Sequence, residues 1–105
     1  MKKQFDFSIM RFYGVLEESQ DYEILAEDEK DALLLAVADL GDLYAYTADE
    51  AKQKAQEFMD DELGKGWTVR QFLESDMELW TIDGICYQIR DVSQHDARSQ
   101  SASFA

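Results

Sequence analysis

Few side chains in this sequence could carry acid–base or nucleophilic chemistry. It contains one histidine, His95, and one cysteine, Cys86. A general base must lie within hydrogen-bond reach of the proton that it removes, and no residue near His95 could orient it against a nucleophile. Cys86 lies among apolar residues, where a thiol is usually a small core side chain rather than an activated nucleophile. We therefore expect that the protein is not an enzyme.

Carboxylate-rich segments are the next candidates, because the oxygens of Asp and Glu bind hard cations. Such segments occur at residues 27–29 and 60–62. A calcium-binding loop needs oxygen ligands at alternating positions, but residues 39–50 place Leu43 and Ala45 where such ligands should fall. The sequence also has no glycine-rich phosphate loop, no paired cysteines and no two-histidine helix motif. We expect no bound metal and no cofactor.

Charge is the property that departs furthest from ordinary composition. The formal net charge is −13 over 105 residues, and residues 16–83 contain twenty acidic side chains against five basic ones. At neutral pH such a surface repels nucleic acid and anionic membranes and attracts basic surfaces. The simplest alternative is that the charge serves only solubility. We expect the partner to be a basic protein surface on a nucleic-acid-binding effector or nuclease, with no direct contact to nucleic acid or membrane.

Composition predicts a single folded domain in the cytoplasm. Hydrophobic residues make up 46% of the chain and aromatic residues 12%, which is enough for a core inside an acidic shell. A lone cysteine excludes an intramolecular disulfide and gives no support for secretion. The longest apolar run, residues 32–38, is much shorter than the roughly 20 residues of a membrane-spanning helix. We expect residues 1–92 to form one compact acidic domain and residues 93–105 to be a disordered tail.

The first half of the sequence predicts a hairpin followed by a helix. Residues 4–13 begin with alternating apolar and polar side chains, which is typical of a strand with one buried face. Residues 17–21 are polar and are expected to form a turn, and residues 22–26 the returning strand. Asp28 is a good N-cap for a helix over residues 29–40, and we expect Gly41 at its C′ position.

Two further helices follow from capping patterns. Thr47 and Glu50 have the spacing of a capping box at the start of a second helix, which Gly64 ends. Thr68 and Gln71 repeat that spacing and predict a short third helix ending near residue 75.

The C-terminal hairpin is the clearest local pattern. Residues 78–82 and 85–90 flank residues 83–84, an Asp-Gly dipeptide typical of a two-residue type I′ turn. Such a turn pairs Trp80 with Tyr87. With the first hairpin and the helices, it predicts an α+β fold, in which a four-stranded antiparallel sheet from two β-hairpins carries the two to three intervening helices on one face.

This expected register also assigns the faces of the C-terminal hairpin. Trp80 and Ile82 fall on the buried face. Leu79 and Cys86 fall on the opposite face, where a half-exposed surface could pair with a second copy. We therefore expect a monomer or a homodimer.

The acidic residues have a spacing that suits imitation of nucleic acid. Carboxylates one helical turn apart lie about 5–6 Å from each other, comparable with the spacing of phosphates along a DNA strand. Residues 60–62 lie at the negative end of a helix dipole, where each acid is unfavourable by about 0.3–1 kcal/mol, so their position favours a function beyond solubility. The candidate partner-binding residues are Glu17, Glu18, Asp21, Glu23, Glu27, Asp28, Glu50, Glu57, Asp60, Asp61 and Glu62.

In composition and size the chain resembles phage or plasmid accessory proteins that inhibit host defence as DNA mimics, including anti-CRISPR and antirestriction proteins. The resemblance implies an inhibitor that occupies a basic nucleic-acid groove of a defence protein. The alternative is an immunity protein or antitoxin that neutralises a cationic nuclease toxin. Tyr44, Tyr46 and Trp67 are candidate interface anchors, although core packing is the favoured interpretation of Trp67.

Overall fold

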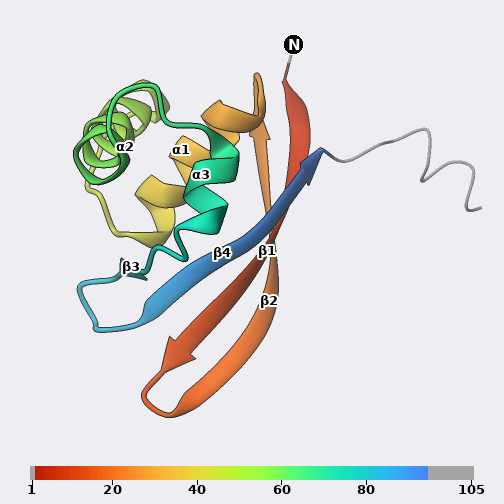
Figure 1. The fold of residues 1–105 in the computed structure, drawn as a ribbon, viewed down its shortest axis with the longest axis vertical. Helices are drawn as coiled ribbons and strands as arrows, with labels where there is room; N and C mark the ends of the chain where they lie inside the picture. Colours follow the sequence, from red (N-terminus) through yellow and green to blue (C-terminus); the bar gives the residue numbers. More distant parts are fainter. Residues whose placement is uncertain (1, 95–105) are drawn as a thin grey trace, which may run out of the picture.

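The computed structural model describes residues 2–94 and has an α+β fold, in which a four-stranded antiparallel sheet carries its helices on one face (Figure 1). The strands lie in the order β2-β1-β4-β3. This arrangement confirms the predicted fold class. In chain order the elements are β1 (Lys3–Tyr13), β2 (Leu16–Ala26), α1 (Glu29–Leu40), α2 (Ala48–Leu63), α3 (Val69–Glu74), β3 (Leu79–Trp80) and β4 (Cys86–Gln94).

The N-terminal hairpin is longer than its sequence pattern predicts. Tyr13 pairs with Leu16, so residues 14 and 15 form the turn, and Gly14 has a φ of 62°. A positive φ at the first central position is typical of a type II′ turn, and glycine adopts it without steric cost. The predicted turn over residues 17–21 is therefore wrong. These polar residues continue β2 along the edge of the sheet, where they are exposed.

β1 lies in the middle of the sheet and supplies much of the core. Three of its side chains are at most 2% exposed: Phe5, Phe7 and Ile9. β4 pairs with β1 on the side opposite β2, with a register shift in which Ser8 pairs with Asp91 but Ile9 pairs with Ile89. Arg90 is therefore a bulged residue without a pairing residue on β1. The bulge allows Ile89 to remain buried opposite Ile9.

α1 packs on the sheet and begins and ends at the predicted residues. The side chain of Asp28 accepts a hydrogen bond from the amide of Asp31 at 2.8 Å, which confirms the predicted N-cap. Gly41 follows the helix, as predicted, but as its C-cap rather than at the C′ position, and its φ is −93°. A Cβ at position 41 would lie 2.9 Å from the carbonyl oxygen of Val37, and close packing therefore favours glycine there. The left-handed residue is Asp42, with a φ of 53°.

The other two helices are capped by threonines. Thr47 Oγ1 accepts a hydrogen bond from the amide of Glu50 at 3.1 Å, but the Glu50 carboxylate accepts from the amide of Tyr46 at 3.2 Å instead of completing a box with Thr47. Thr68 and Gln71 form the complete predicted capping box of α3. α2 packs against α1 on the side away from the sheet (Figure 1), so the fold has a third layer.

The C-terminal hairpin differs from its predicted register by one residue. A three-residue loop replaces the expected two-residue turn: the amide of Gly84 donates to the carbonyl of Thr81 at 3.0 Å, and Gly84 has a φ of 86°. This is the pattern of a type I turn followed by a left-handed glycine. The resulting pairs are Leu79 with Tyr87 and Trp80 with Cys86.

The changed register moves the side chains of the first strand of this hairpin to the other face, because a shift of one residue reverses the side to which each residue of a strand projects. Tyr87 and Ile89 of β4 remain on the helix side, as predicted. Leu79 is 3% exposed, whereas Trp80 is 57% and Ile82 91% exposed. The predicted burial of Trp80 and Ile82 is therefore wrong. Cys86 is also buried, so the predicted half-exposed face of Leu79 and Cys86 for pairing with a second copy is wrong as well.

The described chain ends within the sheet. β4 extends to Gln94, so residues 93 and 94 belong to the sheet and not to the predicted tail. His95 and the rest of that tail lie outside the described residues. Within residues 2–94, no helix has the length and apolar character needed to cross a membrane.

Candidate functional site

The sheet face that points away from the helices carries a group of carboxylates. Alternate residues of a strand project to opposite faces, and the buried residues of β1 define its helix side. On the outward side, Asp6 pairs with Glu23, and Ser8 pairs with both Asp21 and Asp91. We call five outward carboxylates the acidic sheet face: Asp6, Glu17, Asp21, Glu23 and Asp91.

Sheet geometry sets the spacing of these carboxylates. Residues two apart on a strand are separated by about 6.6 Å, and neighbouring strands by about 4.8 Å. Asp21 and Glu23 are two apart on β2, and Asp6 lies directly across from Glu23. Like charges directly opposite each other are unfavourable for a sheet. Sheet stability therefore does not explain this pairing of acids.

The basic residues of the described strands lie outside the pairing positions of the acidic sheet face, and the one next to it in sequence is Arg90, at the bulge beside Asp91. Within the described part of the chain, no lysine or arginine occupies an outward pairing position on β1, β2 or β4. Arg11 projects to the helix side, where its Nη1 lies 3.4 Å from a carboxylate oxygen of Glu18. Gln4 Nε2 donates a hydrogen bond to Asp6 at 3.1 Å. The outward pairing positions of the sheet therefore carry acids but no basic side chain.

Four of the predicted binding residues have other surroundings. Glu18 lies on the helix side of β2 and pairs with Arg11. Glu27 and Asp28 lie in the connection from β2 to α1, where Asp28 is the N-cap. Glu50 lies in the first turn of α2, and one of its carboxylate oxygens is 3.6 Å from Lys54 Nζ. These four residues are not part of the acidic sheet face.

The remaining predicted residues form a second acidic group, the acidic end of α2: Glu57, Asp60, Asp61 and Glu62. The last turn of α2 contains no basic residue. Gln56 Nε2 donates to Asp60 at 2.7 Å, while Glu57 and Asp61 are exposed one turn apart. Because α1 separates α2 from the sheet, the two acidic groups do not form one continuous stripe (Figure 1).

Sequence reasoning missed two members of the acidic sheet face. Asp6 alternates with Phe5 and Phe7, so the strand period itself indicates that it points away from the core. Asp91 joins the face only through the pairing of β4 with β1 and the bulge at Arg90. No local signal in the sequence reveals that pairing.

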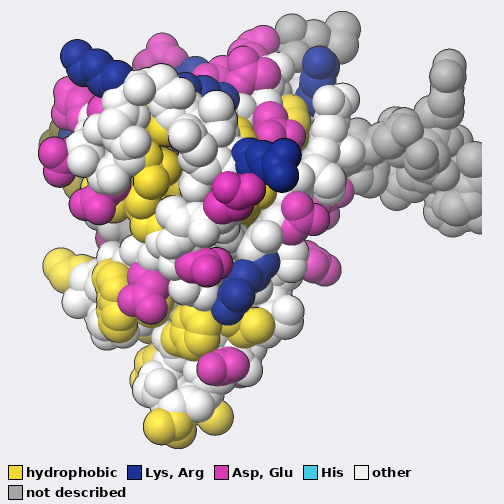
Figure 2. All heavy atoms as spheres, in the orientation of Figure 1, with side chains coloured by type: hydrophobic (Ala, Val, Ile, Leu, Met, Phe, Trp, Pro, Cys, Tyr) yellow, Lys and Arg dark blue, Asp and Glu magenta, His cyan; other side chains and the backbone are white. Residues whose placement is uncertain are grey.

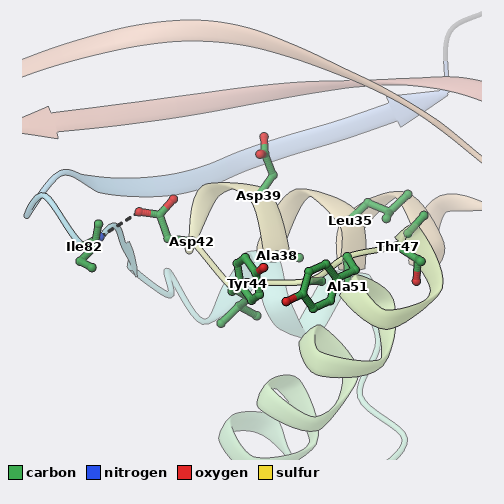
Figure 3. Close-up of a pocket in the computed structure, with 12 residues that line it drawn as sticks. Leu35, Ala38, Asp39, Asp42, Tyr44, Thr47, Ala51 and Ile82 are labelled. Carbon is green, nitrogen blue, oxygen red and sulfur yellow. Dashed lines mark hydrogen bonds between the residues drawn. The ribbon is translucent and has the colours of Figure 1, made fainter.

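A groove lies beside the connection from α1 to α2. Apolar side chains also reach the surface in patches on the face shown in Figure 2. The groove has a volume of about 730 Å³, and we call it the tyrosine groove. Tyr44 and Tyr46 are exposed at the groove, and their ring centroids lie 5.0 Å apart in an edge-to-face arrangement. Figure 3 shows its other labelled lining residues: Leu35, Ala38, Asp39, Asp42, Thr47, Ala51 and Ile82.

Two carboxylates at the tyrosine groove have different roles. Asp42 Oδ2 accepts a hydrogen bond from the amide of Ile82 at 2.9 Å and so joins the end of α1 to the β3–β4 loop (Figure 3). Asp39 points toward the sheet and accepts a hydrogen bond from the Tyr22 hydroxyl. Burial, this hydrogen bond and the charge of Asp39 raise the pKa of Tyr22, so its phenol stays protonated to a higher pH than that of an ordinary tyrosine.

The described residues offer neither an activated nucleophile nor a metal cluster. Burial, with a smaller effect of Glu78, raises the pKa of the Cys86 thiol, which disfavours the reactive thiolate. Across residues 2–94, no three His, Cys, Asp or Glu side chains lie together in a way that could hold a metal ion. Trp67 is buried in the core and is therefore not an interface anchor, whereas Tyr44 and Tyr46 are exposed.

Comparison of the chain with protein-family models, with curated proteins and with solved structures gives no significant match.

Proposed function

We propose that the protein is an acidic inhibitor that imitates a nucleic-acid backbone and blocks a basic nucleic-acid-binding surface of a host defence protein. It would act in the cytoplasm as an anti-CRISPR or antirestriction protein encoded by a phage or mobile element. The observation that carries this proposal is the acidic sheet face, which presents carboxylates across three adjacent strands without a basic residue at its pairing positions. A basic cleft attracts such a surface because it is built to attract phosphates.

Protection of a sheet edge is the principal structural alternative. Charged side chains on an edge strand prevent it from pairing with another chain, and Glu17, Asp21 and Glu23 lie on the edge strand β2. Asp6 lies on β1, which pairs with β2 on one side and with β4 on the other. Asp91 pairs with β1 alone, because β3 pairs with β4 only at Tyr87 and Cys86. Edge protection does not account for an acid on the interior strand β1, so the position of Asp6 favours a binding role.

Three charge-neutralising substitutions on each acidic group provide a matched test. The sheet variant carries Glu17→Gln, Asp21→Asn and Glu23→Gln, and the helix variant carries Glu57→Gln, Asp61→Asn and Glu62→Gln. Both variants lose the same amount of charge, so a difference between them reports position rather than net charge. The immobilised full chain and both variants are used to capture proteins from a bacterial lysate at low and at high salt.

We expect the wild type and the helix variant to retain a nucleic-acid-binding protein at low salt, and the sheet variant to release it. A duplex oligonucleotide should displace this partner, because both ligands would occupy the same basic surface. Equal binding by the two variants would contradict the proposal. Binding that is sensitive to the sheet substitutions but not displaced by the duplex would favour the alternative, an immunity protein or antitoxin against a cationic nuclease.

A further inference from the structure

We propose that the tyrosine groove receives an arginine that lies beside a large apolar residue in a segment of the basic partner. In this arrangement the guanidinium binds the carboxylate of Asp42, and the apolar neighbour packs against Tyr44 and Tyr46. The inference rests on the proposed function in one respect, which is that the partner is a basic protein.

The walls of the groove suit an apolar anchor. Leu35, Ala38 and Ala51 line it, and Tyr44 and Tyr46 are 67% and 81% exposed. Ile82, which is 91% exposed, lies at the end of the groove near Asp42 (Figure 3). Large aromatic side chains that fill or line pockets at an interface commonly contribute most of its binding energy. These residues therefore provide a contact surface that the acidic sheet face lacks.

Asp42 supplies the charge that selects the occupant. One oxygen of the Asp42 carboxylate accepts a hydrogen bond from the amide of Ile82. No lysine or arginine among residues 2–94 forms an ion pair with Asp42. A carboxylate has acceptor capacity for further hydrogen bonds beyond this one. Arginine fits this position better than lysine, because its planar guanidinium binds carboxylates through two donors and stacks on aromatic rings.

A cation already lies against one wall of the groove. Lys54 Nζ is 5.7 Å from the ring centroid of Tyr44, donates to the Tyr44 carbonyl and forms an ion pair with Glu50. Lys54 thus contacts the α1–α2 connection from the side of α2. Asp42 instead lies near Ile82, where its carboxylate can form an ion pair with a ligand.

Charge also decides between a partner protein and a second copy of this chain. Each copy carries a net charge of −13, so two copies repel each other, whereas a basic segment is attracted. The aromatic walls give the segment its apolar contact, and Asp42 gives it a charge-assisted hydrogen bond. The occupant that satisfies both is a cationic segment with an apolar residue next to its arginine.

The test uses two short peptides and backbone NMR of the full chain labelled with ¹⁵N. The probe is acetyl-Leu-Arg-Leu-amide, and its control has citrulline in place of arginine, which keeps the shape but removes the charge. We expect saturable shifts in the amides of residues 42–51 and 82 at millimolar peptide, with affinity for the citrulline peptide lower by about two- to fivefold.

Variants of the protein separate the two contacts. Asp42→Asn removes the charge but keeps an acceptor for the Ile82 amide and tolerates the positive φ at that position, so the fold is retained. It should lower the affinity for the arginine peptide by about two- to fivefold and leave the affinity for the citrulline peptide unchanged. Tyr46→Ala should lower the affinity for both peptides by about tenfold. Asp61→Asn, which removes the same charge from the distant end of α2, should change neither.

The proposal is overturned if the shifts fall outside the groove, if both peptides bind equally, or if the chain self-associates through the groove without peptide. The outcomes also separate this inference from the proposed function. If the partner is lost from the sheet variant but retained by Asp42→Asn and Tyr46→Ala, the groove is not a binding site and the inhibitor proposal stands. If the groove binds the arginine peptide but the sheet variant keeps the partner, the inhibitor proposal fails and the groove assignment stands.

Discussion

Residues on the two sides of β1 are neighbours in sequence but have opposite surroundings. Phe5 and Phe7 lie in the core under the helices, whereas Asp6 between them points away from the helices and pairs with Glu23. The helix side must be apolar for the domain to fold, because burial of apolar area is the main favourable contribution to stability. The outward side around Asp6 has no such requirement, so its composition there reflects solubility or binding rather than folding.

The helix side should therefore respond strongly to truncation, and the outward side hardly at all. Phe7 is 1% exposed, and Phe7→Ala should lower the free energy of unfolding by about 3–5 kcal/mol. Its neighbour Ser8 projects to the outward face, and Ser8→Ala should change the free energy of unfolding by less than about 0.5 kcal/mol. Urea denaturation of both variants measures the difference. Similar losses for the two substitutions would mean that the faces are not distinct.

Charge reversal should give the opposite result, with a large effect on binding and a small one on stability. Glu17→Lys, Asp21→Lys and Glu23→Lys together should weaken binding to the captured partner by about 100-fold or more, because like charges then face each other across the interface. The matched reversal of Glu57, Asp61 and Glu62 changes net charge equally and should leave affinity within about threefold. Titration calorimetry at fixed salt gives both values. Equal losses would assign the effect to net charge.

A hydrogen bond on the helix side makes stability depend on pH. The pKa of Tyr22 is raised above its ordinary value of 10 by burial and by Asp39. A raised folded-state pKa favours the protonated phenol, so this stabilisation is complete below about pH 10 and is lost as the pH rises through the folded-state pKa. Tyr22→Phe should remove this part of the alkaline destabilisation and lower the free energy of unfolding at pH 7 by about 0.5–1.5 kcal/mol.

Chemical denaturation at several pH values between 7 and 11 checks this expectation. Tyr13→Phe, which removes an exposed hydroxyl at the end of β1, is the control and should leave the alkaline profile as it is in the wild type. An unchanged profile in Tyr22→Phe would show that the bond to Asp39 does not link folding to pH.

The smallest expected effect is a gain in stability on the outward face. Asp6 lies directly opposite Glu23, and Asp6→Asn removes one of two facing charges while keeping an acceptor for Gln4. We expect the free energy of unfolding to rise by about 0.2–1 kcal/mol at low salt and the gain to shrink as salt is added. A loss of stability that salt does not change would indicate that Asp6 contributes to the fold.

Local patterns predict most of the helical part of this fold. Asp28, Thr47 and Thr68 are N-caps as expected, because capping depends on residues within one turn of each other. The C-terminal hairpin was predicted one residue out of register, because an Asp-Gly pair fits both a two-residue turn and a three-residue loop with a left-handed glycine. The choice depends on which face of the strand packs on the helices, and that is a tertiary property.

The candidate site was less predictable than the fold. The acidic residues singled out from the sequence include the end of α2 and three members of the acidic sheet face, but not Asp6 and Asp91, which are distant from each other in sequence. Strand order and the bulge at Arg90 bring them to one face. The tyrosine groove likewise depends on the exposed position of Ile82, which follows from the register of the C-terminal hairpin.

Carboxyl footprinting of the complex tests the central claim most directly. Asp and Glu side chains are labelled with a carbodiimide and an amine in the free chain and in the chain bound to its captured partner, and mass spectrometry reads the labelling of each residue. We predict that Glu17, Asp21, Glu23 and Asp91 lose labelling on binding, while Glu57, Asp61 and Glu62 remain labelled as in the free chain. Protection confined to the end of α2, or spread evenly over all acidic residues, would contradict the account.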